Sequence, residues 1–122
     1  MKVTRFDEAF IVMQDSRMTG RRLYASDGAT IIHMTIHPNQ EIAPHTADVD
    51  MEFFVIAGSG RFSVGGESAD AGSGRFSVGG ESADAGPGML VESPADIPHG
   101  IANTGSIPLE LLAVKNGKGR PS

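Results

Sequence analysis

Glycine and proline interrupt this chain at intervals that leave no room for a long helix. The 16 glycines and 7 prolines are spread over all 122 residues rather than gathered in a linker. Both residue types favour turns, so the segments between them are short. Six or more strands at a spacing of roughly ten residues are typical of a β-sandwich or barrel. We therefore predict an all-β fold.

Several segments carry the pattern of strands. In residues 29–38, Ile32, Met34 and Ile36 alternate with polar residues, and this period of two places them on one face of a strand. Residues 51–58 form a compact run of β-forming residues. We expect its apolar side chains in the core; they are Met51, Phe53, Phe54, Val55 and Ile56. Residues 1–25 predict either a short strand or a helical turn.

A perfect tandem duplication lies in the middle of the chain. Residues 57–70 read AGSGRFSVGGESAD, and residues 71–84 repeat them without a change. Two units are too few for a stacked solenoid, so one copy is surplus to the parent domain. Each copy holds two short arms around a glycine pair, which predicts a hairpin turn at Gly65-Gly66. Either copy can fill the parent position, and we expect the other to add a duplicated strand or hairpin segment or to exchange between subunits.

Composition narrows the classes of partner. The net charge of −5 and the lack of a run of basic residues argue against a nucleic-acid partner. No apolar stretch is long enough for a membrane span or a signal peptide, and the absence of cysteine excludes disulfides. We expect a cytoplasmic protein with one domain, residues 1–114, that contains the duplicated segment 57–84. Residues 115–122 are expected to form a flexible tail.

Two segments resemble the signature motifs of the cupin family. Residues 88–103 read GMLVESPADIPHGIAN, in which Gly88, Pro94, His99 and Asn103 stand at the offsets of the second cupin motif. Asp96 takes the place of a glycine there. Residues 38–60 resemble the first motif, with Asn39 at its first glycine and His45 at its first histidine. The resemblance spans residues 29–114 and implies a jelly-roll β-barrel.

The resemblance also implies a divalent metal, Fe, Mn, Zn or Ni, held by motif histidines and a carboxylate. His45 and His99 match two of these ligands, whereas Ala47 stands where the family has another histidine. Counting forward from Ala47 gives Glu52 as the carboxylate, and counting back from Gly58 gives Met51. The two counts place opposite faces of one strand inward, so the predicted metal site is His45, His99 and Glu52, or a pair of histidines.

A third ligand could also come from the segment before His45. His33 and His37 share one face of the predicted strand and are otherwise expected to be plain exposed residues.

The sequence is compatible with three functions. The first is a metal-dependent enzyme acting on a small polar or sugar-like substrate, in which a metal acts as a Lewis acid or binds O₂. The second is a non-catalytic barrel that binds a small molecule, which Ala47 favours. The third is a chain whose duplication was introduced deliberately, with the activity of the parent incidental. A homodimer is expected in each case.

Overall fold

The computed structural model describes residues 1–65, 67–71, 74–78 and 80–117, with residues 67–71 and 74–78 described by their backbone. One turn of 3-10 helix, η1 (Phe6–Glu8), precedes the strands. The strands are β1 (Phe10–Gln14), β2 (Met18–Ala25), β3 (Ala29–Ile36), β4 (Glu41–His45), β5 (Met51–Ala57), β6 (Gly60–Val64), β7 (Glu67–Ala71), β8 (Gly74–Val78), β9 (Glu81–Ala85), β10 (Leu90–Ser93), β11 (His99–Asn103) and β12 (Leu109–Asn116). The all-β prediction is confirmed.

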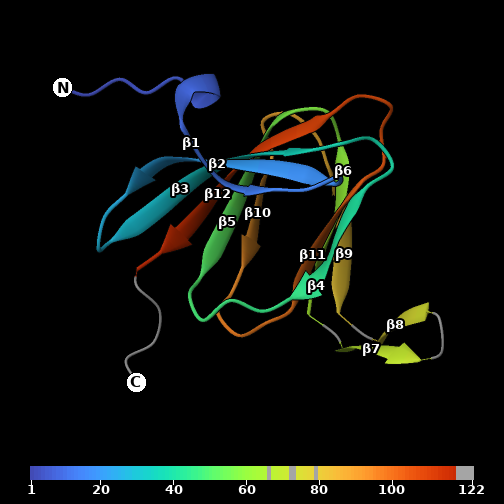
Figure 1. The fold of residues 1–122 in the computed structure, drawn as a ribbon. Coiled ribbons are helices and arrows are strands. Elements are labelled where there is room, and N and C mark those ends of the chain that lie inside the picture. Colours follow the sequence, from blue (N-terminus) through green and yellow to red (C-terminus); the bar gives the residue numbers. More distant parts are fainter. Residues whose placement is uncertain (66, 72–73, 79, 118–122) are drawn as a thin grey trace.

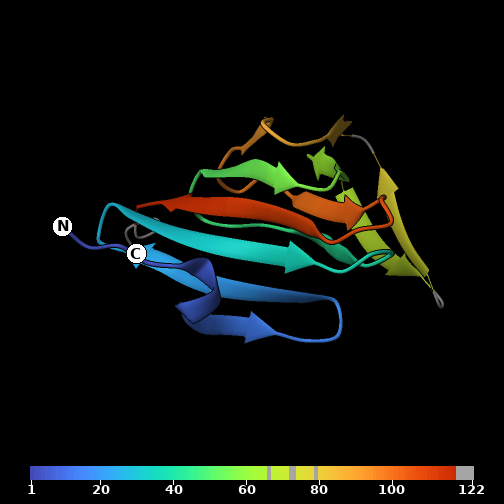
Figure 2. The same cartoon turned by 90° about the horizontal axis from the view of Figure 1, so that it is seen from above.

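Two antiparallel sheets form the walls of the barrel (Figures 1 and 2). The larger has the strand order β1-β2-β3-β12-β5-β10, and the smaller has the order β4-β11-β6-β9. The last strand, β12, continues to Asn116, two residues into the predicted tail, and residues 118–122 of that tail lie outside the described residues. Among the described residues, no helix has the length and apolar character needed to cross a membrane, and the cytoplasmic location stays a prediction.

The core lies between the two sheets and follows the alternation of the strands. Its buried members are Met18, Met34, Ile36, Phe53, Val55, Phe62, Ala85, Ile101, Leu109, Leu111 and Ala113. On β5, Phe53 and Val55 are buried, but Phe54 and Ile56 are exposed on the outer face. The prediction that the whole apolar run is core is therefore wrong for these two, because neighbouring side chains of a strand point to opposite faces.

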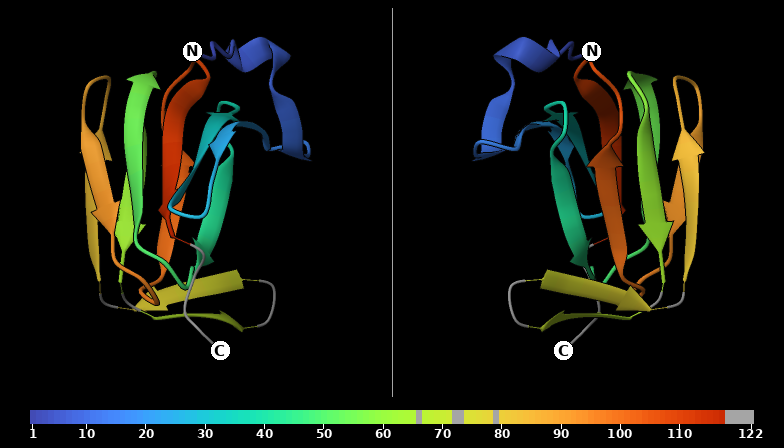
Figure 3. Two further views of the ribbon diagram at one scale, coloured as in Figure 1. Left: turned by 90° about the vertical axis from the view of Figure 1, so that its left-hand side faces the viewer. Right: turned by 90° about the vertical axis from the view of Figure 1, so that its right-hand side faces the viewer.

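The duplicated segment divides between two sheets in a way that the sequence does not predict. Strand β6 of the first copy pairs with β9 of the second copy. The remaining strands, β7 and β8, pair with each other in a separate two-stranded sheet. Figures 1 and 3 show this sheet beyond the ends of β6 and β9. The barrel position is thus filled by one arm from each copy.

In the strand pairs β6–β9 and β7–β8, the same residue types stand opposite each other. In the barrel, Gly60 faces Ala85 and Val64 faces Glu81, and in the second pair Gly74 faces Ala71 and Val78 faces Glu67. The predicted hairpin, with residues 61–64 against residues 67–70 across Gly65-Gly66, is wrong because the identical segment 81–85 takes the place of residues 67–71. Gly66 itself lies outside the described residues.

An ion pair joins the two copies across β6 and β9. Arg61 Nε and Nη2 donate to the two carboxylate oxygens of Asp84, at 3.0 and 3.2 Å. The guanidinium holds the pKa of Asp84 below its ordinary value. Both side chains are well exposed, so solvent screening leaves this pair a small part in stability.

Positive φ angles occur where the two motifs call for glycine. Gly58 and Gly88 have φ values of 80° and 86°, and Asn39 and Asp96 have φ values of 63° and 64°. A side chain at Gly58 would also place its Cβ 2.5 Å from the carbonyl oxygen of Pro108. Asn and Asp adopt this left-handed conformation more readily than other side chains. The backbone of both motifs is therefore kept although two of the glycines are absent.

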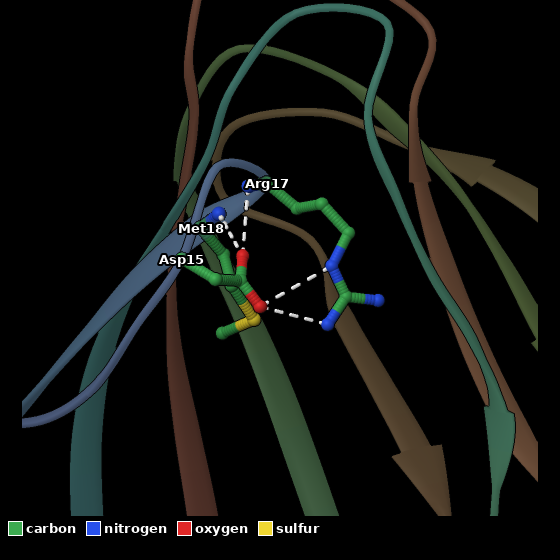
Figure 4. Close-up of polar contacts among 3 residues, drawn as sticks. All are labelled: Asp15, Arg17 and Met18. Atoms are coloured by element: carbon green, nitrogen blue, oxygen red, sulfur yellow. Dashed lines mark hydrogen bonds and ion pairs between the residues drawn. The ribbon is translucent and has the colours of Figure 1, made fainter.

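The turn between β1 and β2 is closed by one carboxylate (Figure 4). Asp15 Oδ1 accepts hydrogen bonds from the backbone N–H groups of Arg17 and Met18, at 2.7 and 3.2 Å. Its Oδ2 accepts hydrogen bonds from the Arg17 guanidinium, and these contacts lower the pKa of Asp15 to about 2. The turn fixes the start of β2, where Met18 enters the core.

The N-terminal helical turn η1 covers the outer face of the larger sheet. Phe6 stacks on the ring of His33, with centroids 4.3 Å apart. Arg21 Nη1 donates to the carbonyl oxygens of Asp7 and Ala9, at 3.2 and 3.1 Å. His33 is 4% exposed as a result, so the expectation that it is a plain exposed residue is wrong. This cover comes from a segment distant in the sequence, so the strand pattern around His33 does not predict it.

This cover should control the protonation of His33. Burial lowers the pKa of His33, Glu110 raises it through a contact of 3.4 Å with Nε2, and Arg21 lowers it. The Phe6→Ala change admits water to the ring, so we expect the pKa of His33 to rise in an NMR titration of its imidazole. Phe10→Ala, which removes an exposed ring beneath Arg22, should leave this pKa unchanged.

The same shift gives a pH dependence of stability. Because folding lowers the pKa of His33 from 6.5, the unfolded chain takes up the proton first as the pH falls through that value. The His33 contribution to the unfolding free energy should therefore decrease below this pH, and it should decrease less in Phe6→Ala. A His33 pKa that is the same in both proteins would contradict this account.

Candidate functional site

The two motif histidines face each other at one end of the smaller sheet. His45 ends β4, His99 begins β11, and the two are direct partners in the strand register. Their ring centroids lie 4.5 Å apart in an edge-to-face arrangement, and the ring of Phe53 lies 5.3 Å from that of His99. His99 is 3% exposed, whereas His45 is exposed at the rim. The structure therefore brings together two of the three predicted site residues.

The histidine pair borders a cavity of about 560 Å³ between the sheets. Its walls are mainly apolar, with a few polar side chains. The lining residues are Met13, Met18, Ile32, Met34, Ile42, His45, Thr46, Ala47, Asp48, Met51, Phe53, Asp96, His99, Ile101, Ala113 and Lys115. A concave, mostly apolar cavity with a few polar groups is the usual form of a small-molecule site.

Hydrogen bonds orient both imidazole rings. His45 Nδ1 lies 3.1 Å from the carbonyl oxygen of Ala43, and because a carbonyl only accepts, this nitrogen carries the proton. His99 Nδ1 lies 2.9 Å from the hydroxyl oxygen of Ser93. With each Nδ1 engaged by the protein, Nε2 is the nitrogen that each ring can offer to a ligand.

His99 is neutral at physiological pH. Burial lowers its pKa to about 4, and the neighbouring His45 lowers it as well, while the backbone of Ile97 raises it. A neutral imidazole can act as both a hydrogen-bond donor and an acceptor. The pair is therefore suited to hold one polar group of a ligand without adding a charge at His99.

Glu52 lies apart from this pair. Its carboxylate accepts a hydrogen bond from Asn116 Nδ2, and its neighbours Met51 and Phe53 on β5 are the residues that line the cavity. Met51, which the count back from Gly58 selects, therefore faces the cavity, and Glu52, which the forward count selects, does not. His33 is buried beneath Phe6, and His37 is exposed beyond the end of β3. Neither lines the cavity with His45 and His99.

The side chains present do not fit the divalent-metal site that the resemblance implies. Within the described part of the chain, no group of three or more His, Cys, Asp or Glu side chains could hold a metal ion. Ala47 lines the cavity where another histidine would stand. Two imidazoles are one ligand short of the three protein ligands typical of open catalytic metal sites.

Sequence reasoning missed several residues of the site. Ser93 lies six positions before His99, and no motif identifies it as a partner of the ring. Lys115 lines the cavity although it falls in the predicted tail. The alternation on β12, with buried Leu111 and Ala113, extends to position 115 and could have indicated this direction.

Asn103, the last residue of the second motif, has a structural role. Its Nδ2 donates to the carbonyl oxygens of Ile36 and Ile107, both at 2.9 Å, and its Oδ1 accepts from the N–H of Gly105 at 2.9 Å. It is 4% exposed. The side chain thus ties the end of β11 to the end of β3 and to the following turn.

Comparisons with known proteins agree with this architecture. Residues 70–115 match the family model described as Cupin domain. TT1209 from Thermus thermophilus superposes with a TM-score of 0.73 at 21% identity, covering 96% of this chain and 98% of that chain. The polyketide cyclase RemF from Streptomyces resistomycificus gives a TM-score of 0.74 at 19% identity, covering 99% and 82%.

An oxalate decarboxylase mutant, OxdC, from Bacillus subtilis gives a TM-score of 0.71 at 20% identity, covering 100% of this chain and 32% of that chain. The search of curated proteins gives no match. The fold is a cupin jelly-roll barrel, and the match to the Cupin domain model covers residues 70–115 of this chain.

Proposed function

We propose that the barrel binds a small, largely apolar molecule carrying one hydrogen-bonding group, which His45 and His99 hold. The observation that carries this proposal is the position of the two imidazole rings on the wall of an otherwise mainly apolar cavity of about 560 Å³. Cavities of roughly 300–1,000 Å³ are the common size for small-molecule sites. The apolar walls supply affinity, and the histidine pair fixes orientation.

The cavity walls favour such a ligand over a sugar. Methionine, isoleucine and phenylalanine side chains from six strands make up half of the lining residues, and two alanines add to the apolar walls. A sugar buried there would leave several hydroxyl groups without partners, and each unpaired buried hydroxyl is unfavourable. The polar side chains Thr46, Asp48 and Asp96 are grouped in the loops that border the rim. The ligand proposed here is thus less polar than the sequence suggests.

The structural neighbours do not identify the ligand of this chain. One is a polyketide cyclase and another is an oxalate decarboxylase, so similar barrels serve chemically different molecules. Function follows from the side chains of the site rather than from the fold. In this chain those side chains are two imidazoles facing apolar walls.

Phenol and toluene provide a matched pair of probes, because they differ in a hydroxyl group against a methyl group. We expect calorimetry to show tighter binding of phenol than of toluene, and no binding of glucose. The preference for phenol should fall by about tenfold in a variant that combines His45→Ala and His99→Phe, as for the loss of a buried hydrogen bond. His37→Ala, which changes an exposed histidine outside the cavity, is the control.

Two outcomes would count against the proposed function. One is tight binding of glucose with no binding of phenol. The other is a phenol preference that survives the loss of both cavity histidines. Melting temperatures of all variants are compared first, so that a failure to fold is not taken for a loss of binding.

A further inference from the structure

A buried hydroxyl group lies against the inner histidine of the pair. The hydroxyl oxygen of Ser93 lies 2.9 Å from Nδ1 of His99, and the two residues are 1% and 3% exposed. We propose that this hydroxyl donates to Nδ1, so that His99 presents a protonated Nε2 to the cavity while His45 presents an unprotonated one, and that the pair selects ligands with a hydroxyl group. The inference rests on the proposed function and narrows its ligand class.

The direction of the hydrogen bond follows from the burial of Ser93. Among the described residues, the hydrogen bond of this hydroxyl is the one to Nδ1 of His99, and the burial of Ser93 removes solvent as an alternative acceptor. A proton on Nδ1 would leave the hydroxyl proton buried without an acceptor, which is unfavourable. Nδ1 therefore accepts, and the proton of the neutral imidazole lies on Nε2.

The backbone of Ile97 does not replace Ser93 in this role. Burial and His45 lower the pKa of His99 to about 4, and the backbone of Ile97 raises it. A carbonyl oxygen can accept a proton from the ring but cannot donate one to Nδ1, whereas the Ser93 hydroxyl can. If the hydroxyl is removed, no buried proton is left without an acceptor, so the form of His99 with a proton on Nδ1 should gain population.

His45 has the opposite arrangement of its proton. Its Nδ1 lies 3.1 Å from the carbonyl oxygen of Ala43, which can only accept, so the proton is on Nδ1 and Nε2 is left to accept. Both rings line the cavity. The pair therefore offers a ligand one donor, at His99, and one acceptor, at His45.

A hydroxyl group matches this pair because it donates one hydrogen bond and accepts another. One oxygen at about 2.9 Å from each of two nitrogens can join nitrogens up to about 5.8 Å apart, and the ring centroids of His45 and His99 lie 4.5 Å apart. An ether oxygen cannot donate to His45. The nitrogen of an aromatic amine is a poor acceptor for the proton of His99. We therefore expect a phenol or an alcohol to bind more tightly than an ether or amine of the same shape.

The first test measures the proton positions without any ligand. In ¹⁵N NMR at neutral pH, protonated and unprotonated imidazole nitrogens differ widely in chemical shift, and the His99 signals are those absent from His99→Phe. We expect the proton of His99 on Nε2 and that of His45 on Nδ1. The Ser93→Ala change should raise the population of His99 with a proton on Nδ1. Ser106→Ala, which removes an exposed hydroxyl, should leave it unchanged.

The second test compares three probes of similar shape by calorimetry. The wild type should bind phenol about tenfold more tightly than anisole, which only accepts, or aniline, as for the loss of one buried hydrogen bond. This preference should decrease in Ser93→Ala and persist in Ser106→Ala. Melting temperatures of both variants are compared with that of the wild type first.

The two tests separate this inference from the proposed function. A wild-type His99 with its proton on Nδ1 overturns the inference whether or not phenol binds. Anisole or aniline binding as tightly as phenol overturns the ligand class, and so does a preference that Ser93→Ala leaves unchanged. Failure of all three probes to bind overturns the proposed function and the ligand class together, while the NMR result still decides the role of Ser93.

Discussion

The Phe62→Ala variant is expected to lose about 3–5 kcal/mol of unfolding free energy, the range for removing a large aromatic side chain from a core. Phe62 is 2% exposed, and its ring centroid lies 6.0 Å from that of Phe53. Strand β6 that carries it pairs with β11 on one side and β9 on the other. The N–H of Gly65 also donates to the carbonyl oxygen of Pro98 at 2.7 Å, which holds the end of β6. Urea unfolding monitored by circular dichroism measures the loss.

The duplication provides a matched control for this prediction. Phe76 is the same residue of the second copy, and its strand β8 pairs with β7 in the separate two-stranded sheet. Phe76→Ala should therefore change stability much less than Phe62→Ala. If the two copies exchanged places at little cost, each single variant would stay close to the wild type and the double variant alone would unfold easily. That result would contradict the pairing of β6 with β9.

The Asn103→Ala variant is expected to lose about 2–4 kcal/mol, because its one buried and two partly buried hydrogen bonds are worth roughly 1 kcal/mol each and unpaired partners add to the loss. Its amide holds the carbonyl oxygens of Ile36 and Ile107 and the N–H of Gly105. Asn103→Asp, which keeps the shape but removes both donors, should lose at least as much. Thermal and urea unfolding measure both variants.

Thr104→Ala, at the exposed neighbouring position, is the control for Asn103 and should leave stability nearly unchanged. An Asn103→Ala protein as stable as this control would show that the three bonds contribute little. Phenol binding by Asn103→Ala should persist as long as the protein is folded, because Asn103 does not line the cavity of the histidine pair.

The sequence predicted those parts of the fold that depend on local patterns. The alternation of Ile32, Met34 and Ile36 located β3 and its inner face, as the burial of Met34 and Ile36 confirms. The motif spacing located His99 at the start of a strand and paired it with His45. The positive φ of Asn39 and Asp96 explains why the spacing survives without two of the glycines.

The third site residue could not be decided from spacing. A difference of one position in the count exchanges Glu52 for Met51, and one position reverses the face of a strand. The loop between β4 and β5 sets the count, and its length in this chain is compatible with either alignment. The structure places Met51 on the cavity and Glu52 beside Asn116.

The sequence also could not predict which segments far apart in the chain contact each other. The two copies of the duplication are identical, so the local contacts of β6 are the same with residues 67–71 as with residues 81–85. Only the connections to the rest of the barrel distinguish the two partners, and in the structure β9 lies beside β6. The stacking of Phe6 on His33 is similar, since it joins an irregular N-terminal segment to a strand far along the chain.

A crystal structure of the protein soaked with phenol tests the proposed binding site most directly. The account predicts the phenol ring between the methionine and isoleucine side chains of the cavity, with its hydroxyl oxygen within hydrogen-bond distance of Nε2 of His45 or His99. Phenol bound elsewhere, or bound in the cavity with its hydroxyl turned away from both histidines, would contradict the account.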